Sequence, residues 1–117
     1  MSLHLTPEML EQSYILLCTT LPFRRWRMPS ADEVSFVVMS VNDRSADYYR
    51  LKNGTHRIRI NNKWCDTLDK LNRDMAHEMV HLHLKINCPS NKGVHGKLFN
   101  SRAAQVCRHH VFALGEF

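Results

Sequence analysis

The sequence of 117 residues lacks any hydrophobic run near the ~18–20 residues that are needed to cross a bilayer. Its N-terminus also lacks the successive basic, apolar and small-residue regions of a secretory signal. The first absence argues against a membrane-spanning helix, and the second argues against export. We therefore expect no membrane partner and an intracellular location, in the cytoplasm, nucleoid or nucleus. The length suits one domain, so we expect residues 1–117 to form a single domain.

The four cysteines lack the paired C-x-x-C spacing of a zinc ribbon, so we expect no separate zinc ribbon in the chain. Since nothing else indicates export, we expect reduced thiols, most of them buried. Sixteen basic and eleven acidic residues leave a formal net charge of +5, which is compatible with a polyanionic partner. Eight histidines are many for so short a chain, and they direct attention to a metal site.

The first half of the chain predicts one helix and then a connector. The helix is expected from Thr6 to about Thr20, because Thr6 can cap it and Pro7 suits its first turn. Apolar residues recur along it at helical spacing and should form its buried stripe: Leu10, Tyr14, Leu17 and Leu21. A proline-bounded connector, Leu21–Pro29, should follow this helix.

Three strands are expected after the connector. Val34–Met39 is rich in β-branched and aromatic residues, which favour a strand. Tyr48–Leu51 and His56–Ile60 flank Asn53-Gly54, a dipeptide that suits a tight hairpin turn. These segments predict a small three-stranded antiparallel sheet.

Two helices are expected in the second half of the chain. The longer one should run from about Trp64 to Ile86, because apolar residues alternate by three and four along one stripe: Leu68, Leu71, Met75, Met79, Leu82 and Ile86. A polar loop, residues 87–94, precedes a last helix from about Gly96 to Phe112. The inner side of that helix should carry Phe99, Ala103 and Val106. The order of helix, sheet and two helices predicts an α+β fold.

The longer helix contains His77-Glu78-Met79-Val80-His81, which has the H-E-x-x-H pattern of a catalytic zinc site. His77 and His81 are one turn apart on the side away from the core stripe, so both imidazoles can bind one ion. Glu78 is offset from that side and should reach a water on the ion without being a ligand itself. Zinc lowers the pKa of such a water to ~7. We therefore predict one Zn²⁺, with Glu78 as the general acid/base.

The third protein ligand has several candidates among the remaining histidines. His95 is favoured, because it follows a loop that can fold the chain back and it precedes Gly96. His83 is rotated about 200° from His81 along the helix, so it should be structural or solvated. The others are weaker candidates: His110 near the core or beside the ligands, His109 in solvent, His56 on either face of its strand and His4 at the terminus.

Three segments, in this order and at these separations, resemble the SprT-like (Spartan-type) zinc metalloproteases: His56–Asn61, Ala76–Leu82 and His95–Phe99. The resemblance covers roughly the C-terminal half. It implies a single zincin-like domain whose active-site helix carries the H-E-x-x-H motif, between an N-terminal helix with a small sheet and a C-terminal helix. It also implies that His77, His81 and His95 bind zinc and that Glu78 is the catalytic acid/base. Val94 departs from the pattern, because family members often have glycine there.

The larger members of that family degrade proteins bound or crosslinked to DNA, so the resemblance also implies a DNA-associated substrate. Many relatives carry a further zinc- or DNA-binding module, whereas this chain should contact DNA through the domain itself or through a partner. The best internal candidate is the basic segment Arg24, Arg25, Trp26 and Arg27, since arginine pairs with phosphate and tryptophan stacks on an unpaired base. The alternative is an amphipathic connector in which Trp26 is buried and the arginines are solvated.

Two further pairs of residues are candidates for the cleft. Arg57 and Arg59 share one face of their strand, and we expect them to be solvated in preference to lining the cleft. Tyr48 and Tyr49 point to opposite sides of their strand, so one of them could approach the substrate.

We therefore predict a zinc-dependent peptidase that acts on a protein or peptide substrate, with DNA as a candidate partner. The edge of the sheet would hold an extended peptide, while zinc polarises the scissile carbonyl. Two alternatives remain open: a nucleic-acid-binding module with a structural or catalytically silent zinc site, and a metal-dependent hydrolase of a non-peptide amide. Glu78 argues against a purely structural site, which has no need of that carboxylate. The oligomeric state does not follow from the sequence.

Overall fold

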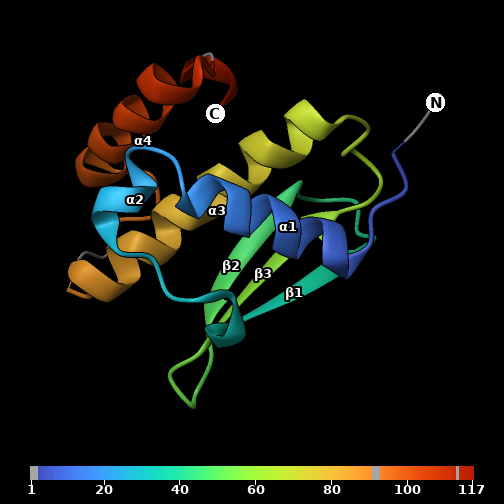
Figure 1. The fold of residues 1–117 in the computed structure, drawn as a ribbon, viewed down its shortest axis with the longest axis horizontal. Coiled ribbons are helices and arrows are strands. Elements are labelled where there is room, and N and C mark those ends of the chain that lie inside the picture. The colour runs from blue at the N-terminus through green and yellow to red at the C-terminus, as the bar shows by residue number, and fades with distance from the viewer. Residues whose placement is uncertain (1–2, 91–92, 113) are drawn as a thin grey trace.

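The fold places its helices on one side of a small sheet (Figure 1). A computed structural model describes residues 3–90, 93–112 and 114–117. The helices and strands in chain order are α1 (Pro7–Cys18), α2 (Phe23–Trp26), the 3₁₀ turn η1 (Ala31–Glu33), β1 (Val34–Met39), β2 (Ala46–Arg50), β3 (His56–Asn61), α3 (Leu68–Asn87), α4 (Lys97–His110) and the 3₁₀ turn η2 (Leu114–Glu116). The described part of the chain therefore has the predicted α+β class.

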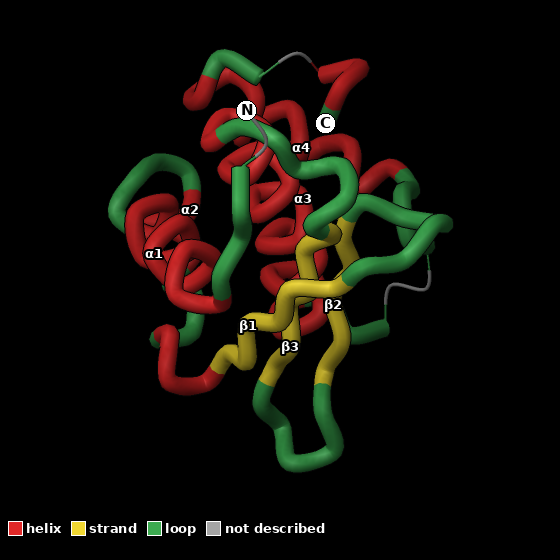
Figure 2. The backbone as a smooth tube through the Cα atoms, turned by 90° about the vertical axis from the view of Figure 1, so that its right-hand side faces the viewer, coloured by secondary structure: helices red, strands yellow, loops and turns green. Residues whose placement is uncertain are grey.

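The sheet is mixed, with its strands in the order β1-β3-β2 (Figure 2). β3 is the central strand, parallel to β1 and antiparallel to β2. The prediction of an all-antiparallel sheet is therefore wrong. The reason is the loop between β1 and β2, residues 40–45, which carries the chain across the end of the sheet and leaves a place for β3. Asn61 holds this loop, because its Nδ2 donates to the carbonyl oxygens of Val41 and Arg44 at 2.7 Å each.

The hairpin between β2 and β3 is confirmed. Gly54 has a φ of 87°, a left-handed conformation that favours glycine. Its N–H donates to the carbonyl of Leu51 at 3.0 Å, and the N–H of Leu51 donates to the carbonyl of Thr55 at 2.8 Å. β2 begins at Ala46, two residues before the predicted start.

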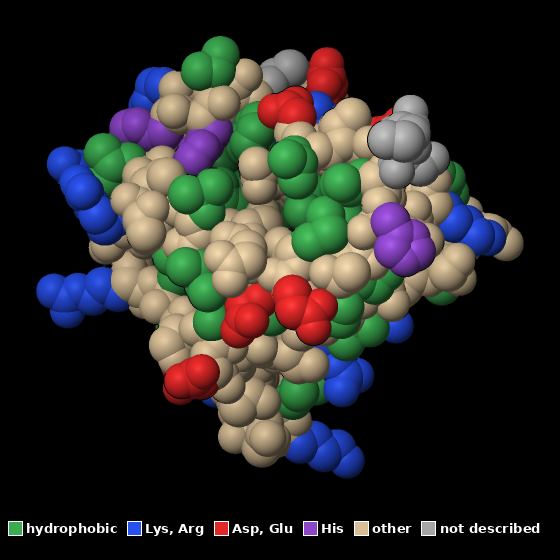
Figure 3. Space-filling view, turned by 45° about the vertical axis from the view of Figure 1, so that its right-hand side comes forward, with side chains coloured by type: hydrophobic (Ala, Val, Ile, Leu, Met, Phe, Trp, Pro, Cys, Tyr) green, Lys and Arg blue, Asp and Glu red, His purple; other side chains and the backbone are tan. Residues whose placement is uncertain are grey.

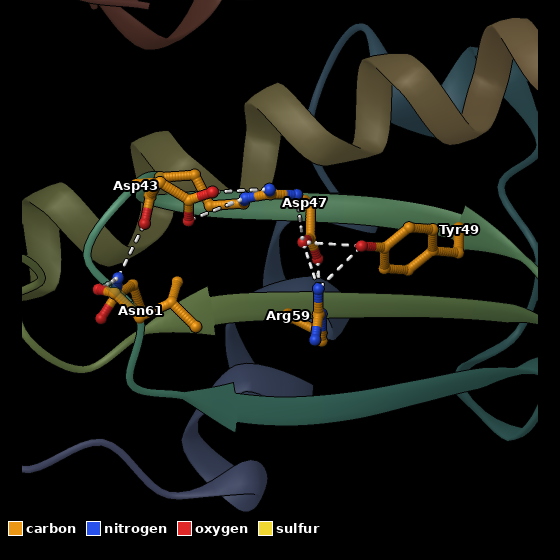
Figure 4. Close-up of polar contacts among 7 residues, drawn as sticks. Asp43, Asp47, Tyr49, Arg59 and Asn61 are labelled. Atoms are coloured by element: carbon orange, nitrogen blue, oxygen red, sulfur yellow. Dashed lines mark hydrogen bonds and ion pairs between the residues drawn. The ribbon is translucent and has the colours of Figure 1, made fainter.

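The two faces of the sheet have different surroundings. The inner face, toward the helices, carries three buried residues of β3: His56, Ile58 and Ile60. On the outer face, Nε and Nη2 of Arg59 reach the two carboxylate oxygens of Asp47 at 2.8 and 2.6 Å. Nη2 of Arg59 also donates to the hydroxyl of Tyr49 at 2.7 Å (Figure 4). Arg59 is thus held in an ion pair on the outer face, where we had expected a solvated side chain.

α1 packs against β1 and α3. Its predicted cap is confirmed, because the N–H of Met9 donates to Oγ1 of Thr6 at 3.2 Å. Three members of the predicted stripe are at most 3% exposed: Leu10, Tyr14 and Leu17. The helix ends at Cys18, so the fourth member, Leu21, lies beyond it and is only half-buried.

α3 lies between the sheet and α4. It begins at Leu68 and not at Trp64, because Thr67 caps it by accepting a hydrogen bond from the N–H of Lys70 at 3.0 Å. The middle of its apolar stripe is in the core, at most 2% exposed: Leu71, Met75, Met79 and Leu82. The two ends of the stripe, Leu68 and Ile86, are 61% and 42% exposed, so the buried stripe is shorter than predicted.

The remaining helices differ in how well they were predicted. α4 agrees with its prediction and buries Phe99, Ala103 and Val106. α2, a single turn, lies inside the predicted connector.

No helix in the described ranges is both long and apolar enough to span a membrane. Hydrophobic side chains do gather in the middle of one face of the molecule (Figure 3).

Candidate metal centre

α3 and the segment before α4 bring three histidines together. His77 and His81 are one turn apart on α3, and their Nε2 atoms are 3.3 Å apart. His95 lies just before Gly96, the N-cap of α4. Its Nε2 is 3.1 Å from that of His77 and 3.2 Å from that of His81. The three predicted ligands therefore point their Nε2 atoms at one common point.

The triangle of nitrogen atoms has the size that a zinc ion requires. Tetrahedral zinc with Zn–N bonds of ~2.0–2.1 Å places its ligand nitrogens about 3.3–3.4 Å apart. The separations of 3.1, 3.2 and 3.3 Å are close to this value. Among the described residues, these three histidines are the group of side chains that could hold a metal ion. Three imidazoles that face a cleft leave a fourth position open, and this donor set suits Zn²⁺.

Burial keeps two of the three imidazoles unprotonated at neutral pH. The loss of solvent lowers the pKa of His77 to about 4. The same cause, together with the neighbouring imidazoles, lowers the pKa of His81 to about 3. A metal ion binds the neutral form of histidine, so both side chains are available as ligands without first losing a proton.

Phe99 of α4 packs against all three imidazoles. Its ring centroid lies 4.9 Å from that of His77, 4.5 Å from that of His81 and 4.8 Å from that of His95. Because Phe99 is itself 4% exposed, it restricts the positions of the three rings. The sequence predicted Phe99 only as a core residue. The one signal in the sequence for the contact of Phe99 with the imidazoles is its position four residues after His95, a separation of about one helical turn.

Glu78 lies on α3 beside the three nitrogens but outside their triangle. Its side chain is 5% exposed and lines the same cleft as the histidines. Burial raises the pKa of its carboxyl to about 8, and the nearby charges of Asp47 and Asp74 add to this effect. A cation in the triangle would act in the opposite direction, because a positive charge favours the carboxylate. The position of Glu78 agrees with the predicted offset from the ligands.

A cleft of about 540 Å³ is lined by the three histidines and Glu78. Its other walls come from β2 (Ala46–Arg50), the C-terminal half of α3 and the segment before α4. β2 is an edge strand, since the described sheet ends with it. An edge strand presents unpaired main-chain N–H and C=O groups. The cleft therefore connects the histidines to a strand edge.

Both tyrosines of β2 line this cleft, although their hydroxyl groups are engaged elsewhere. The hydroxyl of Tyr48 lies 2.7 Å from Nδ1 of His56, and burial raises the pKa of Tyr48 to about 12. The hydroxyl of Tyr49 is bonded to Asp47 and Arg59 on the outer face. Their rings shape the wall of the cleft.

The other histidines lie outside the triangle. His83 is buried, and its ring stacks on Trp26 with the centroids 4.0 Å apart, which confirms the structural alternative predicted for it. Nε2 of His110 lies 2.9 Å from the hydroxyl of Thr20, at the edge of the core. His109 is exposed, as predicted. The structure thus separates His95 from every other candidate for the third ligand.

The basic segment lies on and just after α2, away from the cleft. Arg24, Arg25 and Arg27 are exposed. The ring of Trp26 is half-buried and stacked on His83, so it is not free to stack on a base through that face. None of these four described residues lines the cleft. For Trp26 the structure agrees with the amphipathic alternative, and it leaves the three arginines available to solvent.

Comparison with known proteins identifies a family match over most of the chain. The model of the SprT-like family matches residues 18–114, which is most of the sequence. The match includes α2, the three strands, α3 and α4, so it extends beyond the C-terminal half on which the resemblance was based. No curated protein and no solved structure matches the chain.

Proposed function

The chain belongs to the SprT-like family, and on this premise we propose that it is a zinc-dependent peptidase with a zincin-like active site. The observation that carries the proposal is the convergence of three Nε2 atoms, within 3.3 Å of one another, beside a buried carboxyl. His77, His81 and His95 would hold one Zn²⁺. The bound ion would supply Lewis-acid polarisation of the scissile carbonyl and activation of a water.

Glu78 would be the general acid/base. Two acidic residues line the described cleft, Asp47 and Glu78, and the carboxyl of Asp47 is already paired with Arg59 at 2.6 Å. The carboxyl of Glu78 lies beside the three imidazoles and has no basic side chain as a described partner. It would take a proton from the attacking water and pass it to the leaving amine. Phe99 would keep the imidazoles in place during this transfer.

The substrate would be an extended peptide bound along β2. The free edge of this strand lies in the wall of the cleft, so its main-chain groups could pair with those of the peptide. Main-chain pairing is independent of side-chain identity, and it would align the scissile bond in front of the histidines. The proposal is therefore a peptidase that accepts unfolded or exposed segments of proteins.

Replacement of Glu78 by Gln tests the proposal, because glutamine has the size of glutamate but cannot accept the proton. We expect Glu78→Gln to bind one zinc per chain, as the parent does, and to cleave a denatured protein at least about 100-fold more slowly. Zinc content by atomic absorption and cleavage by gel electrophoresis are the measurements. Glu8→Gln, at an exposed position of α1, is the matched control and should cleave like the parent. Equal cleavage by Glu78→Gln and the parent would refute the role of Glu78.

A more specific form of this proposal is a peptidase that cleaves DNA-associated proteins. The alternative function is a nucleic-acid-binding module with a catalytically silent zinc site. The exposed arginines at positions 24, 25 and 27 favour contact with phosphate. Their joint replacement by Ala should weaken binding to a single-stranded oligonucleotide and reduce its salt dependence, measured by fluorescence anisotropy. Joint replacement of the exposed Lys52, Lys97 and Arg108 removes the same charge elsewhere and is the control. Tight binding without any proteolysis would support the module, and equal losses in the two triple variants would exclude a site on α2.

A further inference from the structure

The last residues of the chain fold back against α3 at His77. We define the C-terminal strap as residues 114–117, of which 115–117 lie outside the part matched by the family model. The main-chain oxygen of Phe117 accepts a hydrogen bond from Nδ1 of His77 at 2.5 Å. Among the three histidines of the triangle, as the structure describes them, His77 is the one whose Nδ1 is hydrogen-bonded to a main-chain oxygen.

This hydrogen bond selects the form of His77 that binds a metal. A main-chain oxygen can only accept, so the imidazole must carry its proton on Nδ1. The lone pair then lies on Nε2, the atom that faces His81 and His95 at 3.3 and 3.1 Å. Such partners fix both the tautomer and the orientation of a ligating histidine, and their loss costs about 10–100-fold in metal affinity.

Three contacts hold the strap in this position. The ring of Phe117 packs on the imidazole of His77 at 5.3 Å between centroids, and it also stacks on Phe112 at 6.1 Å. The carboxylate of Glu116 forms an ion pair with Arg73 at 3.2 Å, one helical turn before His77. Phe117 does not line the cleft, so it contacts His77 from the side away from the space for substrate.

We propose that the C-terminal strap is a positioning element for the metal centre, with the main-chain oxygen of Phe117 orienting His77 and raising the affinity for zinc. This inference rests on the proposed zinc site. It adds to that site a contact from residues that the family match does not include. Glu116 acts through the main chain, so its contribution is to place the oxygen of Phe117, whereas the ring of Phe117 also packs on His77 directly.

Three variants of the full chain test the strap. Deletion of residues 116 and 117 removes the main-chain oxygen of Phe117, Phe117→Ala keeps this oxygen but loses the ring, and Glu116→Gln loses the ion pair. We expect the deletion to raise the zinc dissociation constant about 10–100-fold, measured by competition with a chromophoric chelator. Phe117→Ala should raise it by less and Glu116→Gln by least. The exposed Glu8→Gln should bind zinc like the parent.

Two further readouts separate positioning from a general loss of structure. Thermal unfolding of the zinc-free proteins should be similar for the parent and the deletion variant, whereas stabilisation by added zinc should be smaller in the variant. In ¹⁵N–¹H spectra of the zinc-free parent, His77 should carry its proton on Nδ1, and the deletion should allow the other tautomer. If the deletion variant does not fold, the same measurements on Phe117→Ala test whether the strap positions His77.

The outcomes distinguish this inference from the proposed function. Failure of the parent to bind zinc would overturn both. Suppose that the parent binds zinc and that the deletion variant, or Phe117→Ala if the deletion variant does not fold, binds zinc with equal affinity. The strap then has no positioning role, while the proposed metal centre is unaffected. A zinc-free deletion variant that unfolds much earlier, with an unchanged dissociation constant, would make the strap a purely structural element.

Discussion

Histidines two residues apart on α3 have opposite surroundings in this protein. His81 faces the cleft and the other two Nε2 atoms, whereas His83 is buried and stacked on Trp26. A helix rotates by about 100° per residue, so two residues differ by about 200°. Helical phase alone therefore predicted correctly which of these two histidines faces the cleft.

At the residue scale, His95→Ala should remove one corner of the nitrogen triangle. We expect the zinc content to fall well below one ion per chain after dialysis against a weak chelator, because two imidazoles bind zinc much less tightly than three. His109→Ala, at an exposed position of α4, is the matched control and should retain the full content. Metal content that is unchanged in His95→Ala would reassign the third ligand, with His83 and His110 as the next candidates.

At the scale of elements, α3 contains two of the three ligands of the proposed metal centre, and a cap sets where the helix begins. It contains His77, Glu78 and His81, packs on β2 and β3 through one side and contacts α4 through another. Its start depends on Thr67, whose hydroxyl accepts the hydrogen bond from Lys70. The cap and the ligands lie almost three turns apart, so stability of the helix end and metal binding should respond separately to substitution.

Thr67→Ala should lower the free energy of unfolding by ~1 kcal/mol, since alanine leaves an N–H of the first turn without its cap. Urea denaturation followed by circular dichroism measures this change. Ser101→Ala, in the exposed side of α4, is the control and should change stability little. The zinc dissociation constant of Thr67→Ala should equal that of the parent. A loss of zinc affinity as large as the loss of stability would contradict this separation of cap and site.

At the scale of the whole molecule, stability should depend on the protonation of buried histidines. His56 on the inner face of the sheet is 5% exposed, and burial lowers its pKa, an effect to which the charge of Arg50 adds and which Glu33 opposes. Nδ1 of His56 also lies within hydrogen-bond distance of the hydroxyl of Tyr48, at 2.7 Å. Protonation of His56 would therefore place a positive charge in a buried position, beside the charge of Arg50.

The sign of the pH effect follows from the lowered pKa. Below about pH 6.5 the unfolded chain binds a proton that the folded His56 does not, so stability falls as the pH falls toward the folded pKa and then levels off. The loss is about 1.4 kcal/mol for each unit that separates the two pKa values. In urea titrations of the zinc-free protein between pH 7.5 and 5, His56→Gln should show a shallower dependence than the parent. The exposed His109→Gln should keep the dependence of the parent, and parallel curves for His56→Gln and the parent would exclude this contribution.

The sequence by itself determined those features that depend on neighbouring residues. Periodicity placed α1, α3 and α4, turn chemistry placed the hairpin at Gly54, and the helical spacing predicted that His77 and His81 share one side of α3. Each of these features follows from contacts within about one turn of helix or one hairpin. The family resemblance, carried by three short motifs, is confirmed by the match to residues 18–114.

Only the tertiary structure decided which distant segments meet. The parallel pairing of β1 with β3 depends on a loop that skips a position in the sheet, and no residue pattern within either strand encodes it. The contacts of Phe99 and Phe117 with the histidines likewise join segments that are apart in the chain. Such contacts depend on how whole elements pack, because a buried aromatic residue has the same local pattern whether it touches a leucine or a metal ligand.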